Sequence, residues 1–392
     1  MPEIWLGYGS TDVVLDIKFE NLANELTPAF KALDETEVKS ILETVQLKEG
    51  QLILVLSAGK AVARILYELV KSGRMQGVSN LSIDVPSPVT SILRSNLAGI
   101  AEANSQDSIS VNRIDPGSYS IAERLERFAS AVVISNTSVD PLFGFGGVPT
   151  SLLRYFMASD MAAAFSSRRD NIPAPGVSEK PLEVAVDAMA KVNILQSVEV
   201  IAGGRRPDEI SGLHAGPVAE AFYKSVSQLK ANCEYHQPKS KAVIASAGEA
   251  ADSHSTLNNS LNSLWNTIPY LDDGGTAVLL AECRNGIGGG ALQMCIEGKI
   301  KPEQFDTTLA PIPYTSGIEH LMYIKELGKK FDLGIVTSLP KYYAGSQLGF
   351  SVYRGAKEAL ENTLQKRGKN SKILVVPDGD LLMPALAIES KS

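Results

Sequence analysis

Two glycine-rich segments of this chain have the composition of ligand-binding loops. The first contains Gly144, Gly146 and Gly147, and the second contains Gly286 and Gly288. Each segment follows a predicted buried strand and precedes a predicted helix. Glycine lets the backbone approach a ligand closely, and the N–H groups at a helix N-terminus bind anions. We therefore expect anion binding at these loops, although plain strand-to-helix turns would leave the same pattern.

Three arginines are the cationic residues that we expect to reach such a site. Arg64 lies near the start of the first helix that follows a strand, and Arg168 and Arg169 are adjacent in the polar segment 166–180. Proline and glycine in that segment indicate a mobile loop. The guanidinium fork matches a carboxylate or a phosphate. The alternative interpretation of Arg168 and Arg169 is a solvated basic pair.

The four histidines of the chain lie in or after the closing part of the first predicted domain. Asp252 and His254, with Ser255, have the residue types of a polar catalytic cluster, but Asp-x-His is a common spacing and a surface loop is the simpler interpretation. We assign ordinary structural or linker roles to the rest: His214, His236 and His320. Structural metal sites usually need four ligands, so we predict no metal site.

Cys283 ends a predicted buried strand beside the second glycine-rich segment. Reactive thiols occupy partly exposed, electropositive places, and Arg284 supplies one positive charge. A buried and inert cysteine is the simpler interpretation.

Composition excludes several classes of protein. The chain has 392 residues and a net charge of −7, whereas nucleic-acid binders usually present a basic face. Three cysteines argue against a disulfide framework and suit a reducing cytoplasm. We see neither a signal peptide nor an apolar run long enough to span a bilayer. The expectations are a cytoplasmic location and partners that include neither nucleic acid nor membrane; the oligomeric state stays open.

The elements that must position these residues alternate between strands and helices. After an opening hairpin, we predict strands over 52–56, 81–85, 109–112, 131–135, 197–202, 242–246, 276–282, 333–337 and 373–376. Helices are predicted between them, including one near 150–165. Such alternation is typical of parallel sheets.

The predicted fold class is α/β, with two domains that each contain a largely parallel sheet flanked by helices. The polar segment 231–241 suggests domains of residues 1–235 and 236–392. Ligands of such sheets bind beyond the carboxyl ends of the strands. Both glycine-rich segments are therefore expected to face one inter-domain cleft.

A series of segments, in order along the chain, resembles the nickel-dependent lactate racemase family. They are Leu6–Gly9, Leu142–Gly147, Val198–Gly203, Ala215–Tyr223, Ile244–Gly248 with Asp252, Asp273–Gly275, Ala281–Gly288 and Val375–Gly379. The resemblance implies a two-domain lactate racemase-like fold. It also implies a nickel-bearing pincer cofactor held by a lysine, a histidine on the nickel, and two further histidines as acid and base.

The residues at the implied catalytic positions differ from the family pattern. Pro149 stands at the lysine position, Phe165 at the nickel histidine and Asp140 at the histidine before the loop. The other implied positions are occupied by Gly59, Val62, Leu257 and Ser260. No histidine precedes His214, so three histidines from the first domain are not available. We expect a divergent member without a covalent nickel-pincer nucleotide and leave any other cofactor open.

Two functions remain open from the sequence. One is an isomerase, a racemase or epimerase of a small hydroxy acid, although lactate racemisation itself is not expected. The other is a non-catalytic or re-purposed protein that binds a small anionic metabolite or nucleotide in the same cleft. Fold alone does not decide between them.

Overall fold

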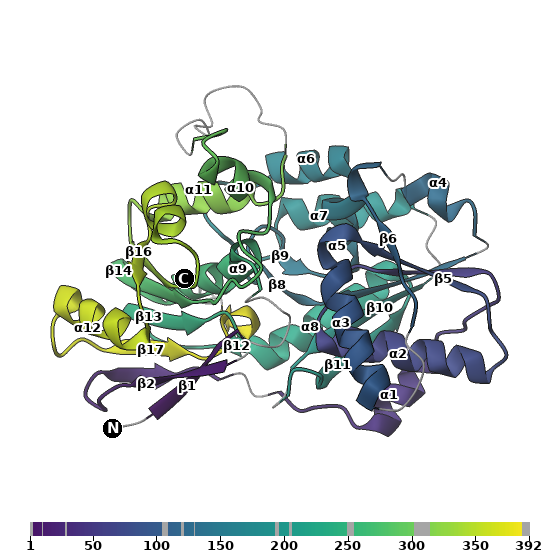
Figure 1. Ribbon diagram of the computed structural model, residues 1–392, viewed down its shortest axis with the longest axis horizontal. Coiled ribbons are helices and arrows are strands. Elements are labelled where there is room, and N and C mark those ends of the chain that lie inside the picture. The colour runs from purple at the N-terminus through teal and green to yellow at the C-terminus, as the bar shows by residue number, and fades with distance from the viewer. Residues whose placement is uncertain are drawn as a thin grey trace, which may run out of the picture.

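The computed structural model describes residues 3–9, 11–27, 30–103, 109–118, 121–128, 130–192, 196–203, 206–248, 255–301 and 314–385. Two six-stranded sheets lie side by side (Figure 1). Helices flank both sheets, and most strand pairs within them are parallel. The predicted α/β class is confirmed.

The first sheet is built from the first half of the chain. Its strand order is β11 (Ile210–Gly216), β10 (Gln196–Ala202), β7 (Ala131–Asn136), β4 (Gln51–Val55), β5 (Leu81–Pro86) and β6 (Asn112–Ile114). Only the β10–β11 pair in this sheet is antiparallel. Every residue of β4 is buried, as expected of a parallel strand covered on both faces.

Helices cover both faces of this first sheet. On one face lie α1 (Glu35–Leu42), α2 (Lys60–Met75) and α3 (Ser87–Ala103). On the other lie α4 (Ile121–Leu125) and α5 (Val148–Phe156). The remaining helices of this half are α6 (Ala158–Ser166), α7 (Lys180–Ala188) and α8 (Val218–Cys233).

The second sheet is parallel throughout. Its strand order is β16 (Ser351–Tyr353), β15 (Asp332–Val336), β14 (Leu271–Leu280), β13 (Ser240–Ser246), β17 (Ile373–Val376) and β3 (Leu22–Glu25). Its helices are α9 (Leu257–Thr267), α10 (Gly290–Ile296), α11 (Ile318–Leu327) and α12 (Ala356–Arg367). The short pair β12 (Glu234–Tyr235) and β18 (Met383–Pro384) joins the linker to the end of the described chain.

The N-terminal segment lies with the second sheet. The hairpin of β1 (Glu3–Tyr8) and β2 (Thr11–Asp16) lies along that sheet (Figure 1). Its Ile4 and Leu6 are buried in a core cluster with residues of the sheet, and β3 pairs with β17. The strand pairing thus departs from the predicted division into 1–235 and 236–392 at this end. The chain crosses from the second sheet to the first after β3, because the apolar face of the hairpin is buried against the second sheet.

Two further expectations are corrected by the structure. The helix predicted near 150–165 is two helices, α5 and α6, because the backbone leaves the helical region at Met157. The segment 166–180, predicted to be a mobile loop, packs on the first glycine-rich segment. Its Gly176 N–H donates to the Gly144 carbonyl at 3.0 Å, and a side chain at Gly144 would strike the Val177 carbonyl.

One large apolar core joins the two halves. It includes Phe143, Phe222 and Leu229 from the first half and Trp265 and Tyr323 from the second, all almost completely buried. The two sheets are therefore held together by a shared hydrophobic core as well as by the chain.

Candidate functional site

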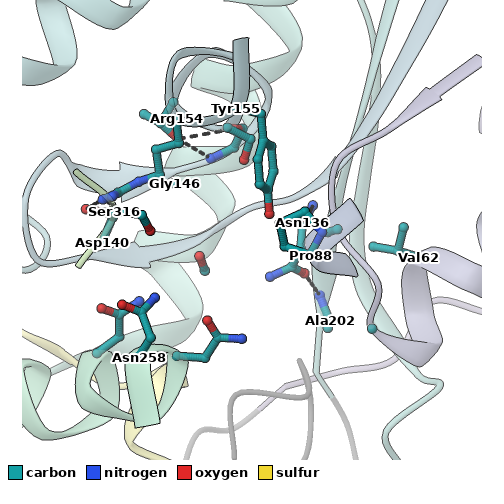
Figure 2. A pocket seen from close by; sticks show the side chains of 18 of the residues that line it. Val62, Pro88, Asn136, Asp140, Gly146, Arg154, Tyr155, Ala202, Asn258 and Ser316 are labelled. Carbon is teal, nitrogen blue, oxygen red and sulfur yellow. Dashed lines mark hydrogen bonds and ion pairs between the residues drawn. The ribbon is translucent and has the colours of Figure 1, made fainter. Parts of the chain in front are cut away.

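A cleft of about 420 Å³ lies between the two halves (Figure 2). The N-terminal turns of α2, α3, α5, α9 and α11 all border it. This placement follows from the parallel sheets, because the carboxyl end of each strand leads into the N-terminus of the next helix. Hydrogen-bonding side chains are abundant in the lining: Ser57, Asn136, Ser138, Thr150, Ser151, Tyr155, Asn258, Asn259, Asn262 and Ser316.

The first glycine-rich segment forms part of the cleft wall. Gly146 and Gly147 line the cleft, whereas Gly144 does not. The N–H of Gly147 donates to Thr150 Oγ1 at 3.0 Å, the N–H of Val148 donates to Glu199 Oε1 at 2.9 Å, and residue 149 is a proline without an N–H. The expected cradle of free N–H groups is therefore absent here, because internal acceptors already use these donors.

Glu199 is the internal partner of the α5 N-terminus. The side chain is fully buried on β10, and its other oxygen accepts from Thr137 Oγ1 at 2.9 Å. Burial raises the pKa of Glu199 to about 8, although the hydrogen bonds from Val148 and Thr137 oppose that rise. The sequence signal for this residue is a single acidic side chain inside the apolar run of β10.

The N-terminus of α2 has the open donors that α5 lacks. Gly59, its N-cap residue, provides no side-chain cap. For the N–H groups of Gly59, Lys60 and Ala61 we find no acceptor within the described part of the chain. Gly59 and Ala61 line the cleft, so this helix end faces the cavity. Asn96 holds the preceding loop by donating to the Ala58 carbonyl at 2.7 Å.

An ion cluster forms the opposite wall and crosses between the halves. Arg154 on α5 contacts Asp140 at 3.1 Å and Glu319 on α11 at 2.5 Å. It also donates to the Tyr314 hydroxyl at 2.9 Å and lies over the Phe143 ring. Burial by itself would raise the pKa of Glu319, but Arg154, with smaller contributions from its neighbours, lowers it below the usual value.

His320, beside Glu319, also lines the cleft. Its Nδ1 accepts from the Trp265 indole N–H at 2.9 Å, so this nitrogen carries no proton. Burial lowers the pKa of His320, which keeps the imidazole neutral near pH 7. The prediction of a structural role agrees with this geometry.

None of the three predicted arginines lines the cleft. Arg64 contacts the Asp208 carbonyl at 3.4 Å on the α2 surface, and Arg169 is exposed. Arg168 lies over the Phe165 ring and donates to the Phe165 carbonyl and to Asn171. Arg168 does not reach the cleft because its guanidinium is held by the Phe165 carbonyl and by Asn171.

The second glycine-rich segment packs against the N-terminal turn of α9 and does not line the cleft. Gly286 and Gly288 are not lining residues, which corrects the expectation that both segments face the cavity. The Ile287 carbonyl accepts from the Asn258 N–H at 3.0 Å, and a Cβ on Gly288 would lie 2.9 Å from the Asn258 Cβ. The segment thus positions the N-terminal turn of α9.

Asp252 and His254 lie outside the described residues. Cys283 is buried, and burial raises the pKa of its thiol to about 11, which agrees with an inert cysteine.

Sequence reasoning missed the residues that define the cleft most clearly: Asn136, Arg154, Asn258, Asn262 and Glu319. Asn136 ends β7, so its place after a buried strand was an available signal. The others lie on helix faces that mix polar and apolar residues, and only packing shows which side meets the cavity.

The cleft does not fit the nickel-bearing cofactor that the resemblance implies. Pro149 is buried in the first turn of α5, and Phe165 is buried against Tyr314. The lining contains no lysine, and the Nδ1 of its one histidine is occupied. Among the described residues, no group of three or more His, Cys, Asp or Glu side chains is placed to hold a metal.

No helix in the described ranges is both long and apolar enough to cross a membrane.

Comparison with known proteins establishes a likeness at the level of fold. No known family model and no curated protein sequence matches the chain. The lactate racemase apoprotein from Thermoanaerobacterium thermosaccharolyticum is similar in structure, with a TM-score of 0.76 and 16% identity over 98% of this chain and 100% of that chain. A protein from Thermotoga maritima gives a TM-score of 0.60 and 11% identity over 92% of this chain and 100% of that chain. The protein thus has a lactate racemase-like fold.

Proposed function

We propose that the protein binds a small carboxylate or phosphate metabolite in the cleft, with the anionic group at the N-terminus of α2. The open N–H groups of Gly59, Lys60 and Ala61 carry this proposal. Such groups and the helix dipole together favour an anion. The asparagine and serine side chains around the cavity supply further donors and acceptors.

Binding is favoured over racemisation because the cleft offers no free base. Among its lining residues the titratable side chains are Asp140, Arg154, Tyr155, Glu319 and His320. The first two are paired with each other, and Glu319 is paired with Arg154. The Nδ1 of His320 already accepts from Trp265, and burial raises the pKa of Tyr155 to about 12. A general base works best when its pKa lies near the operating pH.

The racemase alternative is supported by the fold shared with the lactate racemase apoprotein. It predicts that purified protein supplied with nickel interconverts D- and L-lactate. We expect no interconversion. Chiral chromatography would measure the ratio of the two lactate isomers after incubation with the protein.

A thermal-shift screen of the full chain tests the binding proposal. Carboxylates and phosphates of up to six carbons are the probes, and a true ligand at a hundredfold excess over its dissociation constant stabilises the fold by about 2.7 kcal/mol. We expect Ser57→Asp to abolish the shift, because the new carboxylate lies in the loop before α2 and competes for its N–H groups.

Ser72→Asp is the matched control, since it makes the same change near the other end of α2. We expect this variant to keep the ligand-induced shift. No shift with any probe in the wild-type protein would contradict the binding proposal, as would a shift that survives Ser57→Asp.

A further inference from the structure

The charged side chains that line the cleft are engaged within the protein. Arg154 contacts both Asp140 and Glu319. His320 is buried, and its Nδ1 accepts from Trp265. The side chains that a ligand can still engage in this cleft are therefore uncharged.

Uncharged hydroxyl and amide groups from both halves remain open in the lining. The groups for which we find no hydrogen bond within the described ranges are the Tyr155 hydroxyl, the Asn136 amide nitrogen, the Ser138 and Ser316 hydroxyls and the Asn262 amide. Each of these residues is at least partly exposed, and Figure 2 shows the Tyr155 hydroxyl pointing from α5 into the cavity. Burial raises the pKa of Tyr155 to about 12, so this hydroxyl keeps its proton near pH 7.

A chain of three serine hydroxyls adds to this wall. Ser135 on β7 is fully buried, and its Oγ lies 3.1 Å from the Oγ of Ser57 and 3.2 Å from the Oγ of Ser151. Ser57 and Ser151 both line the cleft, and Ser57 Oγ also accepts from the Asn136 N–H at 3.1 Å. A buried hydroxyl is normally paired, so Ser135 donates to one of these serines and accepts from the other. Two of the three hydroxyl protons are thus used inside the chain, and the third, on Ser57 or on Ser151, is available to the cleft.

The direction of this chain decides what each end offers to a ligand. When Ser57 donates into the cleft, Ser151 donates to Ser135 and its oxygen remains only as an acceptor. When the chain is reversed, Ser151 donates into the cleft and Ser57 remains as an acceptor. A carboxylate or phosphate near pH 7 offers mainly acceptors, so it can satisfy the donor end but not the acceptor end. A ligand hydroxyl can satisfy either.

We propose that the ligand of the cleft is a polyhydroxylated anion, as a sugar phosphate or polyol phosphate is, whose hydroxyl groups bind this uncharged wall. Ser135 is the positioning residue that couples the hydroxyl of Ser57 to that of Ser151. The open amides and hydroxyls and the serine chain carry this assignment, because each needs a partner that can both donate and accept. The inference rests on the proposed function, since it names the class of molecule bound at that site.

Matched pairs of probes that differ only in their hydroxyl groups test the inference. The pairs are glycerol 3-phosphate and propyl phosphate, ribitol 5-phosphate and pentyl phosphate, and 3,4-dihydroxybutanoate and butanoate. Isothermal titration calorimetry of the full chain measures both members of each pair. We expect the hydroxylated member of at least one pair to bind on the order of tenfold more tightly, because the analogue without hydroxyls leaves polar groups of the site unpaired.

Ser135→Ala breaks the serine chain without changing any residue that lines the cleft. We expect it to weaken the hydroxylated member several-fold more than its partner, whereas general damage to the fold would weaken both members alike. Ser197→Ala is the matched control, because it removes another fully buried hydroxyl from the neighbouring strand β10 and should keep the preference.

Tyr155→Phe gives a second test that removes only one oxygen atom, from the open wall. We expect this variant to reduce the preference for the hydroxylated member as well. It keeps the inference testable if Ser135→Ala does not fold.

The outcomes separate this inference from the proposed function. Equal affinities within every pair overturn the polyhydroxylated ligand but leave anion binding in place, as does a thermal-shift hit when no member of any pair binds. A preference that survives Ser135→Ala in a folded variant overturns the positioning role, and one that also survives Tyr155→Phe overturns the assignment of the hydroxyl groups to this wall. If no member of any pair binds, and no probe in the thermal-shift screen does, the binding proposal itself is overturned.

Discussion

At the scale of single residues, the most informative side chains are buried acids with different partners. Glu319 is held ionised by Arg154, whereas the donors to Glu199 within the described ranges, Thr137 and Val148, are uncharged, and burial raises its pKa to about 8. Placing a carboxyl group in an apolar strand is costly when it is charged. The protein therefore holds Glu199 mainly as a neutral acid near pH 7.

The pH dependence of stability should reveal this neutral acid. The folded pKa of about 8 lies above the value of 4.5 for an unperturbed glutamate. The stabilising contribution of Glu199 is therefore fully present below about pH 4.5 and is lost as pH rises through about 8. Glu199→Gln, which mimics the neutral acid, should become progressively more stable than the wild-type protein across this range.

Urea denaturation at pH 5, 7 and 9 measures the difference. One pKa unit corresponds to about 1.4 kcal/mol, so we expect a difference of several kcal/mol at most at pH 9. Glu220→Gln, at an exposed position on α8, should show no such trend. A difference that stays constant with pH would contradict the role assigned to Glu199.

At the scale of elements, the N-terminus of α5 shows how a ligand-like loop can be purely structural. Its donors are used by Thr150 and Glu199, and Gly147 lies against the Phe222 ring. The glycines there allow close packing of backbone against side chain. At α2 the same kind of strand-to-helix junction keeps its donors open.

Two alanine substitutions distinguish these roles within one segment. A Cβ on Gly147 would lie 2.6 Å from the Phe222 ring and 2.9 Å from Glu199 Oε2, so Gly147→Ala should destabilise the fold by about 1–3 kcal/mol. A Cβ on Gly146 would meet Ser138 Oγ at 3.1 Å, which a small rotation of that side chain relieves. Gly146→Ala should therefore cost clearly less.

Chemical denaturation of both variants tests this contrast. Equal losses of stability would show that the packing behind Gly147 does not constrain this junction.

At the scale of the whole molecule, the two halves share one core, and the N-terminal segment supplies one strand to the second sheet. The core joins Phe143 and Phe222 to Trp265 and Tyr323, and β3 from the N-terminal segment completes the second sheet beside β17. The second sheet therefore takes one strand and part of its apolar cover from the N-terminal segment, and both halves contribute to the shared core.

Separated halves should therefore fail to fold. We expect the fragment 236–392 to lack a stable fold, because it loses β3 and the hairpin that covers its sheet. The fragment 1–235 should expose the apolar faces that α9 and α11 cover in the full chain. Circular dichroism during thermal unfolding would test both, with the full chain as the reference.

A cooperative unfolding transition in either isolated fragment would contradict the shared-core interpretation. It would instead support two independent domains with the division that the sequence suggested.

The sequence by itself determined the fold class and most of the strand positions. Buried parallel strands such as β4 and β13 are short apolar runs, and their neighbours along the chain are enough to identify them. The resemblance carried by the glycine-containing segments agrees with the lactate racemase-like fold that the structure displays. These features are local, so each can be recognised from a few consecutive residues.

Only the tertiary structure decided the site. Arg154 and Glu319 are 165 positions apart, and no periodicity along the chain relates them. β3 pairs with β17 because the second sheet has an open edge there, which is not visible in the strand's own residues. Whether a loop donates to a ligand or to its own protein depends on which side chains packing brings to it. At α5 the buried Glu199 already takes a donor, and at α2 no described residue does, so two similar junctions have opposite roles.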